Sequence, residues 1–304
     1  MAGCKPGTPK KTVRFGYTEA DQLHSPAVMV MKEKRLLEAA GFSVKWEEFP
    51  TGTYAVREMA SGSLDFSSCG FVPVMIARSQ GAPVIILAGP NKEGSGLVVH
   101  SAIRTIEELD DKRIGTPGHD SIQDVMMARL ARENHLLIHR MTMDVSDMPF
   151  FLQRNEIDGF IAWAPHPAKA VEQKIGQPLL TSRDIMPNHQ CCVLVTGERI
   201  MQDDPETVSK VLEVYIDAYK WFLENRDESV KLMAKYTGTN EAVILQTLDT
   251  VSYSFPPYCN TESMQDMAVN LIETGRITTG EADPAAFIEE LYRPELLEKI
   301  SDTK

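Results

Sequence analysis

Up to about residue 200, short apolar runs alternate with amphipathic stretches. This alternation constrains the fold most, because strand, helix and strand in succession form the unit from which helix-covered parallel sheets are built. The candidate strands are 12–17, 43–49, 65–70, 83–89, 96–101, 112–118, 139–145, 158–164 and 191–197. The candidate helices are 26–41, 53–62, 71–80, 120–135, 147–155 and 166–175. We predict an α/β protein with mostly parallel sheets.

The pattern changes to helices alone after residue 204. Asp204 followed by Pro205 is a typical helix start, an N-cap residue before a proline in the first turn. Apolar residues then recur on one helical face from Val208 to Phe222. Further helices are expected at about 226–237, 239–250, 260–275 and 283–300. This helical C-terminal tail should cover the sheets from outside.

Two segments of the chain share one plan. In "MASGSLDFSSCG" (59–70) and "LQRNEIDGFIAW" (152–163), a helix ends, and an aliphatic residue and an aspartate then lead into a strand. Each aspartate, Asp65 and Asp158, should stand at the start of its strand. Because ligand crevices lie beyond the carboxyl ends of strands, two such units indicate two similar lobes whose crevices face one another. The match is short, so chance is the alternative.

The turn "GTPGHDSIQDVMMARL" (115–130) has the features of a ligand cradle. Ser121 and Asp124 fit a capping box, and free N–H groups at such a helix start attract acceptor groups. Neither GxxxxGK[ST] nor GxGxxG is present, so no nucleotide fingerprint applies. Asp120 and Asp124 disfavour a dianion, which favours a neutral or singly charged acceptor. The alternative is a helix cap with no ligand.

Several function classes are excluded or disfavoured. The net charge of −12 leaves no basic stripe for nucleic acid, and no apolar run is long enough to span a bilayer. HExxH and GxSxG do not occur. Five cysteines without CxxC spacing disfavour structural zinc, and His135 with His139 is a poor metal pair; we predict no metal and no cofactor. Cys191 and Cys192 should point to opposite faces of a strand, as buried small hydrophobic residues.

The N-terminus "MAGCKPGTPKKT" resembles the end of a bacterial lipoprotein signal. Residues 1–11 are interpreted as a linker, with Cys4 as the candidate lipid anchor. The alternative is an ordinary cysteine in an irregular terminus.

Five segments in order over the first 212 residues give the chain a family resemblance. They include "SGSLDFSSCGFVPVMIARSQGAPVIILAG", "IEELDDKRIGTPGHDSIQD", "NEIDGFIAWAPHPAKA" and "PNHQCCVLVTGERIMQDDPETVSKVL". The sequence resembles solute-binding proteins of the nitrate/sulfonate/taurine class of ABC transporters. The resemblance implies a two-lobed type II periplasmic-binding fold, with lobe I from 12–96 plus 198–304 and lobe II from 97–197. The hinge is expected near 95–98 and 194–198.

The resemblance also implies a ligand site between the lobes. The implied contacts are Asp21, Gln22, His24, Ser68, Cys69, Gly70, His119, Ser121, Gln123, Trp163, His166, His189 and Tyr258. Structural roles are the alternatives: Trp163 in the core, His24 at a helix cap, and His166 and His189 at the surface or hinge. Relatives that bind amines commonly carry an acid after this tryptophan, and Ala164 stands there, which disfavours a taurine-like zwitterion.

The expected function is solute capture for an ABC importer. The chain would be a non-enzymatic monomer in the periplasm or on the outer face of the cytoplasmic membrane. It would bind a small organic or oxyanion solute and deliver it to a permease and its ATPase, with membrane contact only through the lipid anchor. The alternatives are an enzyme like the fungal thiamine-pyrimidine synthase, for which "NHQCC" (188–192) is the nearest cysteine motif, and a sensory module for a partner kinase.

Overall fold

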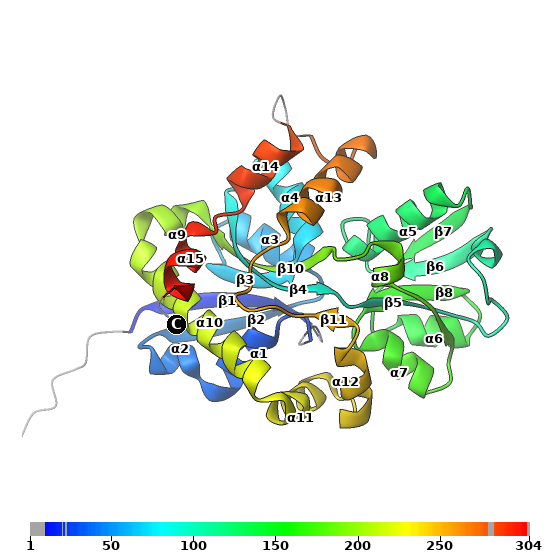
Figure 1. Ribbon diagram of the computed structural model, residues 1–304, viewed down its shortest axis with the longest axis horizontal. Helices are drawn as coiled ribbons and strands as arrows, with labels where there is room; N and C mark the ends of the chain where they lie inside the picture. Colours follow the sequence, from blue (N-terminus) through cyan, green and yellow to red (C-terminus); the bar gives the residue numbers. More distant parts are fainter. Residues whose placement is uncertain (1–9, 20, 22, 279–282, 303–304) are drawn as a thin grey trace, which may run out of the picture.

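The structure is a computed structural model that describes residues 10–19, 21, 23–278 and 283–302. Two β-sheets lie side by side, and each is wrapped by helices (Figure 1). We call each sheet with its helices a lobe. The two-lobed α/β architecture is therefore confirmed, whereas the candidate lipid anchor, Cys4, lies outside the described residues.

The first sheet has six strands in the order β11-β4-β10-β3-β1-β2. These strands are β1 (Thr12–Thr18), β2 (Ser43–Phe49), β3 (Phe66–Gly70), β4 (Val84–Glu93), β10 (Gln190–Gly197) and β11 (Val251–Ser252). The second sheet has the order β7-β6-β8-β5-β9. Its strands are β5 (Ser95–Val99), β6 (Lys112–Thr116), β7 (Ile138–Thr142), β8 (Gly159–Trp163) and β9 (Gln177–Thr181).

Both sheets are mixed, which corrects the expectation of mostly parallel sheets. In the first sheet β1 pairs in parallel with β2 and β3, while β10 runs antiparallel to β3 and β4. In the second, β6 is parallel to β7 and β8, while β5 is antiparallel to β8 and β9. β5 and β10 are the strands that follow the two lobe crossings. Each begins where the chain arrives from the other lobe, at the end of the sheet where the parallel strands finish, and therefore runs against them.

The lobe boundary also differs from the expected one. β10 pairs within the first sheet, so residues 190–197 belong to the first lobe rather than the second. The chain crosses outward at Gly94, directly between β4 and β5, and returns between helix α8 (Ser182–Ile185) and β10. Gly94 has a φ of +97°, and a Cβ there would lie 2.3 Å from His24 Nε2. Only glycine satisfies both conditions at this crossing.

Helices cover both lobes on their outer faces. In chain order up to the tail they are α1 (Pro26–Lys34), α2 (Leu36–Ala39), α3 (Gly52–Ala60), α4 (Phe71–Ser79), α5 (Ile122–Glu133), α6 (Met148–Gln153), α7 (His166–Glu172), α8 and α9 (Glu198–Asp203), with a 3-10 turn at Glu107–Leu109. The expected helices 26–41 and 53–62 are thus present. The first of them is broken at Arg35, whose backbone has a left-handed conformation with a φ of 53°.

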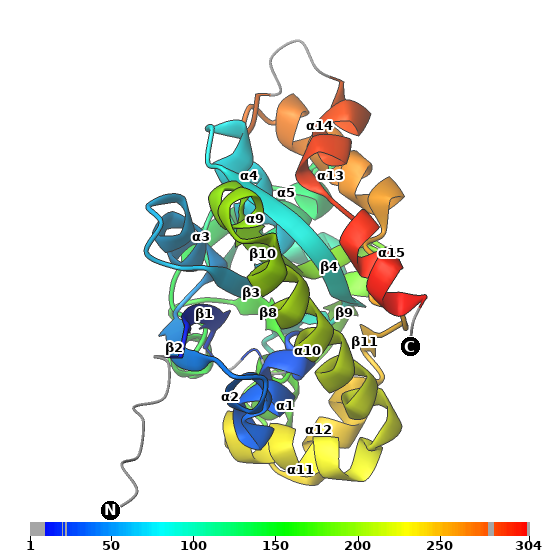
Figure 2. The same cartoon turned by 90° about the vertical axis from the view of Figure 1, so that its left-hand side faces the viewer.

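The C-terminal tail is helical and wraps the first lobe, as expected. It contains α10 (Pro205–Glu224), α11 (Arg226–Thr237), α12 (Glu241–Leu248), α13 (Thr261–Glu273), α14 (Pro284–Leu291) and α15 (Glu295–Ser301). Asp204 caps α10 by accepting a hydrogen bond from the N–H of Thr207. α10 packs on α1, α12 reaches α7 of the second lobe, and β11 is a short departure from the all-helical expectation. Figure 2 shows α10–α12 and α13–α15 as two groups on different sides of β4.

The shared plan of residues 59–70 and 152–163 is a true structural repeat. Asp65 Oδ2 accepts from Arg14 N at 2.8 Å and from Arg14 Nε at 3.0 Å. Asp158 Oδ2 accepts from Arg113 N and Nε at the same two distances. Each aspartate directly precedes its strand and clamps it to the neighbouring parallel strand. Chance is therefore the wrong explanation of the sequence match.

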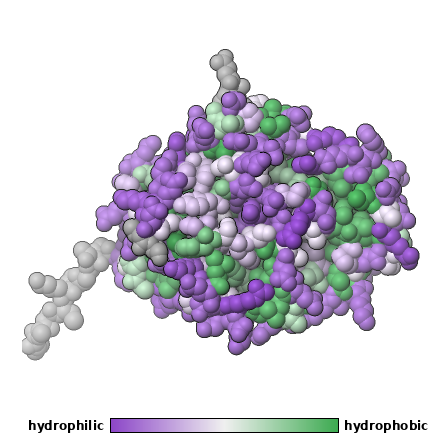
Figure 3. Space-filling model, viewed as in Figure 1, coloured by the Kyte–Doolittle hydropathy of each residue, from purple (hydrophilic) through white to green (hydrophobic). Residues whose placement is uncertain are grey.

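Hydrophobic residues are exposed on both lobes. In Figure 3 they gather on the right-hand lobe, which contains the second sheet, and along the lower part of the other lobe. Leu137, Met141 and Phe150 of the second lobe are exposed. Among the helices that the structure describes, none has the length and hydropathy needed to cross a bilayer.

Candidate ligand-binding cleft

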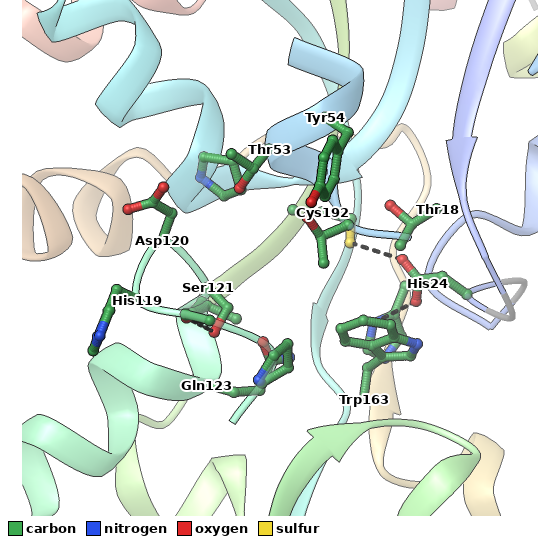
Figure 4. A pocket seen from close by; sticks show the side chains of 18 of the residues that line it. Thr18, His24, Thr53, Tyr54, His119, Asp120, Ser121, Gln123, Trp163 and Cys192 are labelled. Carbon is green, nitrogen blue, oxygen red and sulfur yellow. Dashed lines mark hydrogen bonds and ion pairs between the residues drawn. The ribbon is translucent and has the colours of Figure 1, made fainter. Parts of the chain in front are cut away.

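A cavity of about 440 Å³ lies between the two lobes, at the carboxyl ends of their parallel strands. The first lobe contributes residues after β1, β2 and β3, and the second contributes residues after β6, β7 and β8. Side chains from both lobes face this space in Figure 4, with Tyr54 on one side and Trp163 on the other. The crevices of the two lobes therefore form one cleft, as the repeat in the sequence indicates.

The first lobe supplies a helix start and a cation. The segment Thr51–Tyr54 opens α3 at the cavity, and Arg57 lies one turn further along the same helix. The N-terminal end of a helix carries partial positive charge, and its first N–H groups have no partner within the helix. This wall therefore favours a negatively charged or acceptor group.

The second lobe supplies the turn that the sequence marks as a cradle. Ser121 caps α5, since its Oγ accepts from Asp124 N at 3.2 Å and donates to Gly118 O at 2.7 Å. Gln123 Nε2 donates to Ser95 Oγ at 2.9 Å, which ties the helix start to the crossing strand. His119, Ser121 and Gln123 all line the cavity, as expected.

Asp124 does not complete the capping box; its carboxylate points to two arginines instead. Asp124 Oδ2 accepts from Arg140 Nη1 at 2.9 Å and from Arg276 Nη2 at 2.5 Å. Arg276 also donates to the backbone oxygen of His119. Arg276 follows α13, which packs on α14, and α14 in turn contacts β4 of the first sheet. The tail of the first lobe thus holds the cradle of the second.

Trp163 forms the second-lobe wall of the cavity. It is the last residue of β8, and it both packs in a buried hydrophobic cluster of the second lobe and lines the cleft. His166 lies beside it instead of in the cavity, with an edge-to-face ring contact at 5.9 Å between centroids. Burial lowers the pKa of His166 to about 4, so this imidazole is neutral near pH 7 and supports the tryptophan ring.

The floor of the cleft is a cluster of two thiols, an imidazole and a carboxylate. Cys191 Sγ lies 3.6 Å from His24 Nδ1 and 4.0 Å from Cys192 Sγ, and Cys192 Sγ lies 3.7 Å from Asp21 Oδ2. Asp21 Oδ1 is 3.2 Å from His24 Nδ1. His24 Nε2 contacts Gly94 O at 3.1 Å. Each of these four residues is at most 4% exposed, and all four line the cavity.

The two cysteines correct the expectation that neighbouring strand residues face opposite sides. The pairing of β10 with β4 shifts register between Gln190 and Leu194. A bulge of this kind turns an extra residue out of the alternating pattern. Both thiols therefore face the cleft, and both are free.

The cluster shifts the acidity of its members. Burial raises the pKa of Asp21 to about 7, partly offset by His24. Burial alone would lower the pKa of His24, but the charges of Cys191 and Asp21 raise it to about 9. A hydrogen bond from Cys192 and the positive charge of His24 lower the pKa of Cys191, and the same hydrogen bond with burial raises that of Cys192. The floor therefore places a cationic imidazole beside a sulfur that is more acidic than an ordinary thiol.

Other expected contacts lie away from the cavity. Ser68 Oγ is buried against Ser25 Oγ at 2.8 Å, and Cys69 is buried in the core. His189 is buried with its Nδ1 2.6 Å from Met186 O, and Tyr258 is exposed outside the cleft. Gly70 lines the cavity, and Gln22 lies outside the described residues. The missed lining residues are Thr18, Thr51, Gly52, Thr53, Tyr54, Arg57, Pro73, Pro117, Gly118, Asp120, Ile122, Thr142, Met143, Asp144, Cys191 and Cys192.

A signal for several missed residues was present in the sequence. "TGTY" (51–54) follows the candidate strand 43–49, and "TMD" (142–144) lies near the end of the candidate strand 139–145. The rule that ligands bind at and beyond strand ends applies to them as well.

Three buried polar atoms of residues that line the cleft make no hydrogen bond in the described part of the chain. They are Trp163 Nε1, Thr18 Oγ1 and Asp21 Oδ1, and the last has only its ion-pair contact with His24 Nδ1. A buried donor without a partner costs about 1–3 kcal/mol. A solute oxygen within reach of Trp163 Nε1 or Thr18 Oγ1 would satisfy that group.

Comparisons with known proteins agree with this geometry. The model of the NMT1-like family matches residues 6–237. The taurine-binding periplasmic protein of Escherichia coli (strain K12) is 27% identical over 282 residues, which cover 87% of this chain and 83% of that protein. The solved aliphatic sulphonate binding protein of Escherichia coli has a TM-score of 0.74 at 21% identity, over 93% of this chain and 97% of that one. The nitrate-binding protein of Synechocystis PCC 6803 has a TM-score of 0.81 at 15% identity, over 97% and 89%.

The TM-scores show that the two solved structures share the fold of this chain, although their sequence identity is low. The family match covers most of the chain. The resemblance to solute-binding proteins of the nitrate, sulfonate and taurine class is therefore confirmed. By its sequence and its two-lobed structure, this chain belongs to the NMT1-like family.

Proposed function

We propose that this chain is the solute-binding component of an ABC importer. In this role the two lobes close over a small solute, and a permease with its ATPase receives the solute from the closed protein. The observation that carries the proposal is the cavity of about 440 Å³ lined by strand ends of both lobes. A ligand that contacts both lobes favours their closed arrangement. The relatives that bind taurine and aliphatic sulfonates support the same role.

The walls favour a small organic anion with a singly charged oxyanion head, such as a sulfonate. Arg57 and the start of α3 offer positive charge, while Trp163 Nε1 offers a buried donor. The rings of Tyr54 and Trp163 offer apolar surface for the rest of the solute. Ala164 stands where an amine-pairing acid is common, but Asp21 and Asp144 also line the cavity. An amine on the solute thus has carboxylates within the cleft.

The proposal also includes the location of the chain, its oligomeric state and the fate of the solute. The chain would work as a monomer outside the cytoplasmic membrane, tethered at Cys4, and would release its solute chemically unchanged.

Solute-dependent thermal unfolding tests the proposal. Taurine, short alkanesulfonates, aromatic sulfonates and nitrate are compared at rising concentration. The correct solute at 100 times its dissociation constant should stabilise the protein by about 2.7 kcal/mol. Trp163→Phe keeps the ring but removes the donor, and should weaken solute binding about fivefold, since a neutral hydrogen bond contributes about 1 kcal/mol.

Phe150→Ala is the matched control, because this aromatic residue is exposed on α6 and does not line the cavity. It should leave the solute shift unchanged. The proposal fails if no member of the series stabilises the wild-type chain, or if both aromatic variants behave alike.

A further inference from the structure

The cleft floor has a feature that capture of an organic anion does not require. His24, Cys191 and Cys192 each offer one ligand atom, and these atoms lie within 4.8 Å of one another. His24 is 167 residues from Cys191 in the sequence, so no metal-binding spacing is visible there. The juxtaposition arises from the turn after β1 and from the irregular start of β10.

The separations match those of a tetrahedral metal centre. Zn–S bonds of about 2.3 Å and Zn–N bonds of about 2.0 Å place two sulfur ligands about 3.8 Å apart, and a sulfur and a nitrogen about 3.5 Å apart. The Sγ atoms of Cys191 and Cys192 are 4.0 Å apart, and Cys191 Sγ is 3.6 Å from His24 Nδ1. Two of the three donor pairs are therefore already spaced for one ion, and the third pair lies within 4.8 Å.

The chemistry of the donors selects the ion. Two thiolates and one imidazole favour zinc or another thiophilic cation over magnesium or calcium, which take oxygen ligands. We propose that His24, Cys191 and Cys192 form a zinc site in the floor of the cleft. On binding, the His24 imidazolium and any thiol still protonated lose their protons to solvent, and the negative charges of the two thiolates balance Zn²⁺.

The surroundings of the cluster fit this assignment. Asp21 Oδ2 lies 3.7 Å from Cys192 Sγ, and Asp21 Oδ1 lies 3.2 Å from His24 Nδ1. His24 Nε2 can donate to Gly94 O at 3.1 Å. Such a contact fixes the ring with Nδ1 facing Cys191 Sγ, and a metal bound there would replace the contact of Nδ1 with Asp21. Three protein ligands leave a fourth position open, as in catalytic and exchangeable zinc sites, and it would face the cavity that all three ligands line.

Competition with a chromogenic chelator tests the site in the full chain, without a tag and with its thiols kept reduced. We expect one zinc per chain. The double variant Cys191→Ser/Cys192→Ser should bind zinc at least about 100-fold more weakly. Asp21→Asn should bind it about 10–100-fold more weakly, because residues that contact the metal ligands typically contribute this much to metal affinity. Cobalt bound to the wild type should show thiolate-to-metal charge-transfer absorption.

Cys259→Ser is the matched control, since it removes a buried thiol that does not line the cleft. It should leave zinc affinity unchanged. Equal zinc affinity in the wild type and the double variant would overturn the proposal. So would a cobalt complex of the wild type without thiolate absorption, a result that does not depend on any variant folding. No solute is present, so this outcome is independent of the solute-binding proposal.

Discussion

The two lobes share a scaffold and differ in what they present to the cleft. Arg14–Asp65 and Arg113–Asp158 are the same clamp, with the same two distances to the backbone and Nε nitrogens. Yet the first lobe presents buried thiols, an imidazole and a carboxylate beside the start of α3, while the second presents the capped start of α5 and a tryptophan. The comparison teaches that the repeated arginine–aspartate clamps hold the sheets, whereas residues at the strand ends and in the loops beyond them carry the chemistry.

The largest expected effect concerns the tie between the lobes at Asp124. Asp124→Ala leaves Arg140 and Arg276 without their buried carboxylate partner. We expect a loss of about 3 kcal/mol in the free energy of unfolding, because removing one member of a buried ionic network is costly. Urea unfolding measures it.

Glu133→Gln on the same helix is the control. Its surface pair with Arg129 should contribute no more than about 0.5 kcal/mol. If Asp124 stabilised only the second lobe, Arg276→Ala would leave the free energy of unfolding unchanged. We expect Arg276→Ala to lower it, because Arg276 belongs to the C-terminal tail of the first lobe and pairs with Asp124.

A second test concerns the crossing between the lobes. Glu93 ends β4 next to Gly94, and its carboxylate accepts from Arg183 Nη2 at 2.7 Å, Ser252 Oγ at 2.8 Å and Asn188 N at 2.9 Å. Glu93→Gln should cost about 2 kcal/mol, since charged hydrogen bonds to a buried carboxylate are lost. An unchanged urea midpoint in Glu93→Gln would show that the crossing does not depend on this carboxylate.

The same carboxylate predicts a pH dependence. Burial alone would raise the pKa of Glu93, but the hydrogen bonds from Arg183, Asn188 and Ser252 lower it to about 2. A carboxyl whose pKa is depressed by folding stabilises the folded state above its ordinary pKa, and this contribution is lost as the pH falls. Stability should therefore decline between about pH 4.5 and pH 2. Glu93→Gln should decline less over that range in acid-unfolding measurements.

The smallest expected effect compares the two clamps directly. The side chain of Asp65 is 13% exposed and that of Asp158 is 24% exposed. Asp65→Asn should thus cost more than Asp158→Asn, about 2 against about 1 kcal/mol, because a less exposed ion pair is screened less. Urea unfolding of the two single variants gives both values. Equal losses would mean that the clamps are equivalent in energy as well as in geometry.

Much of this fold is predictable from the sequence, because strands, helices and caps follow local patterns. The alternation up to residue 200, the Asp204–Pro205 helix start and the Asp65/Asp158 repeat all appear in the structure. The predicted strand directions and the predicted lobe of β10 were wrong, because tertiary contacts set the pairing partners of a strand and sequence periodicity does not encode them.

The cleft was only partly predictable, for a similar reason. Seven expected residues line it: Asp21, His24, Gly70, His119, Ser121, Gln123 and Trp163. Whether they bind solute stays a prediction. The neighbouring thiols of Cys191 and Cys192 were assigned to opposite faces, because a register shift in β10 cannot be read from alternation.

The contact between His24 and Gly94 has a mechanical consequence. The imidazole Nε2 at the bottom of the cavity contacts the carbonyl oxygen of the residue where the chain passes from one sheet to the other. Rotation of the backbone at that residue displaces the imidazole, and displacement of the imidazole strains the backbone. The crossing between the sheets and the floor of the cavity are therefore coupled through a single oxygen atom.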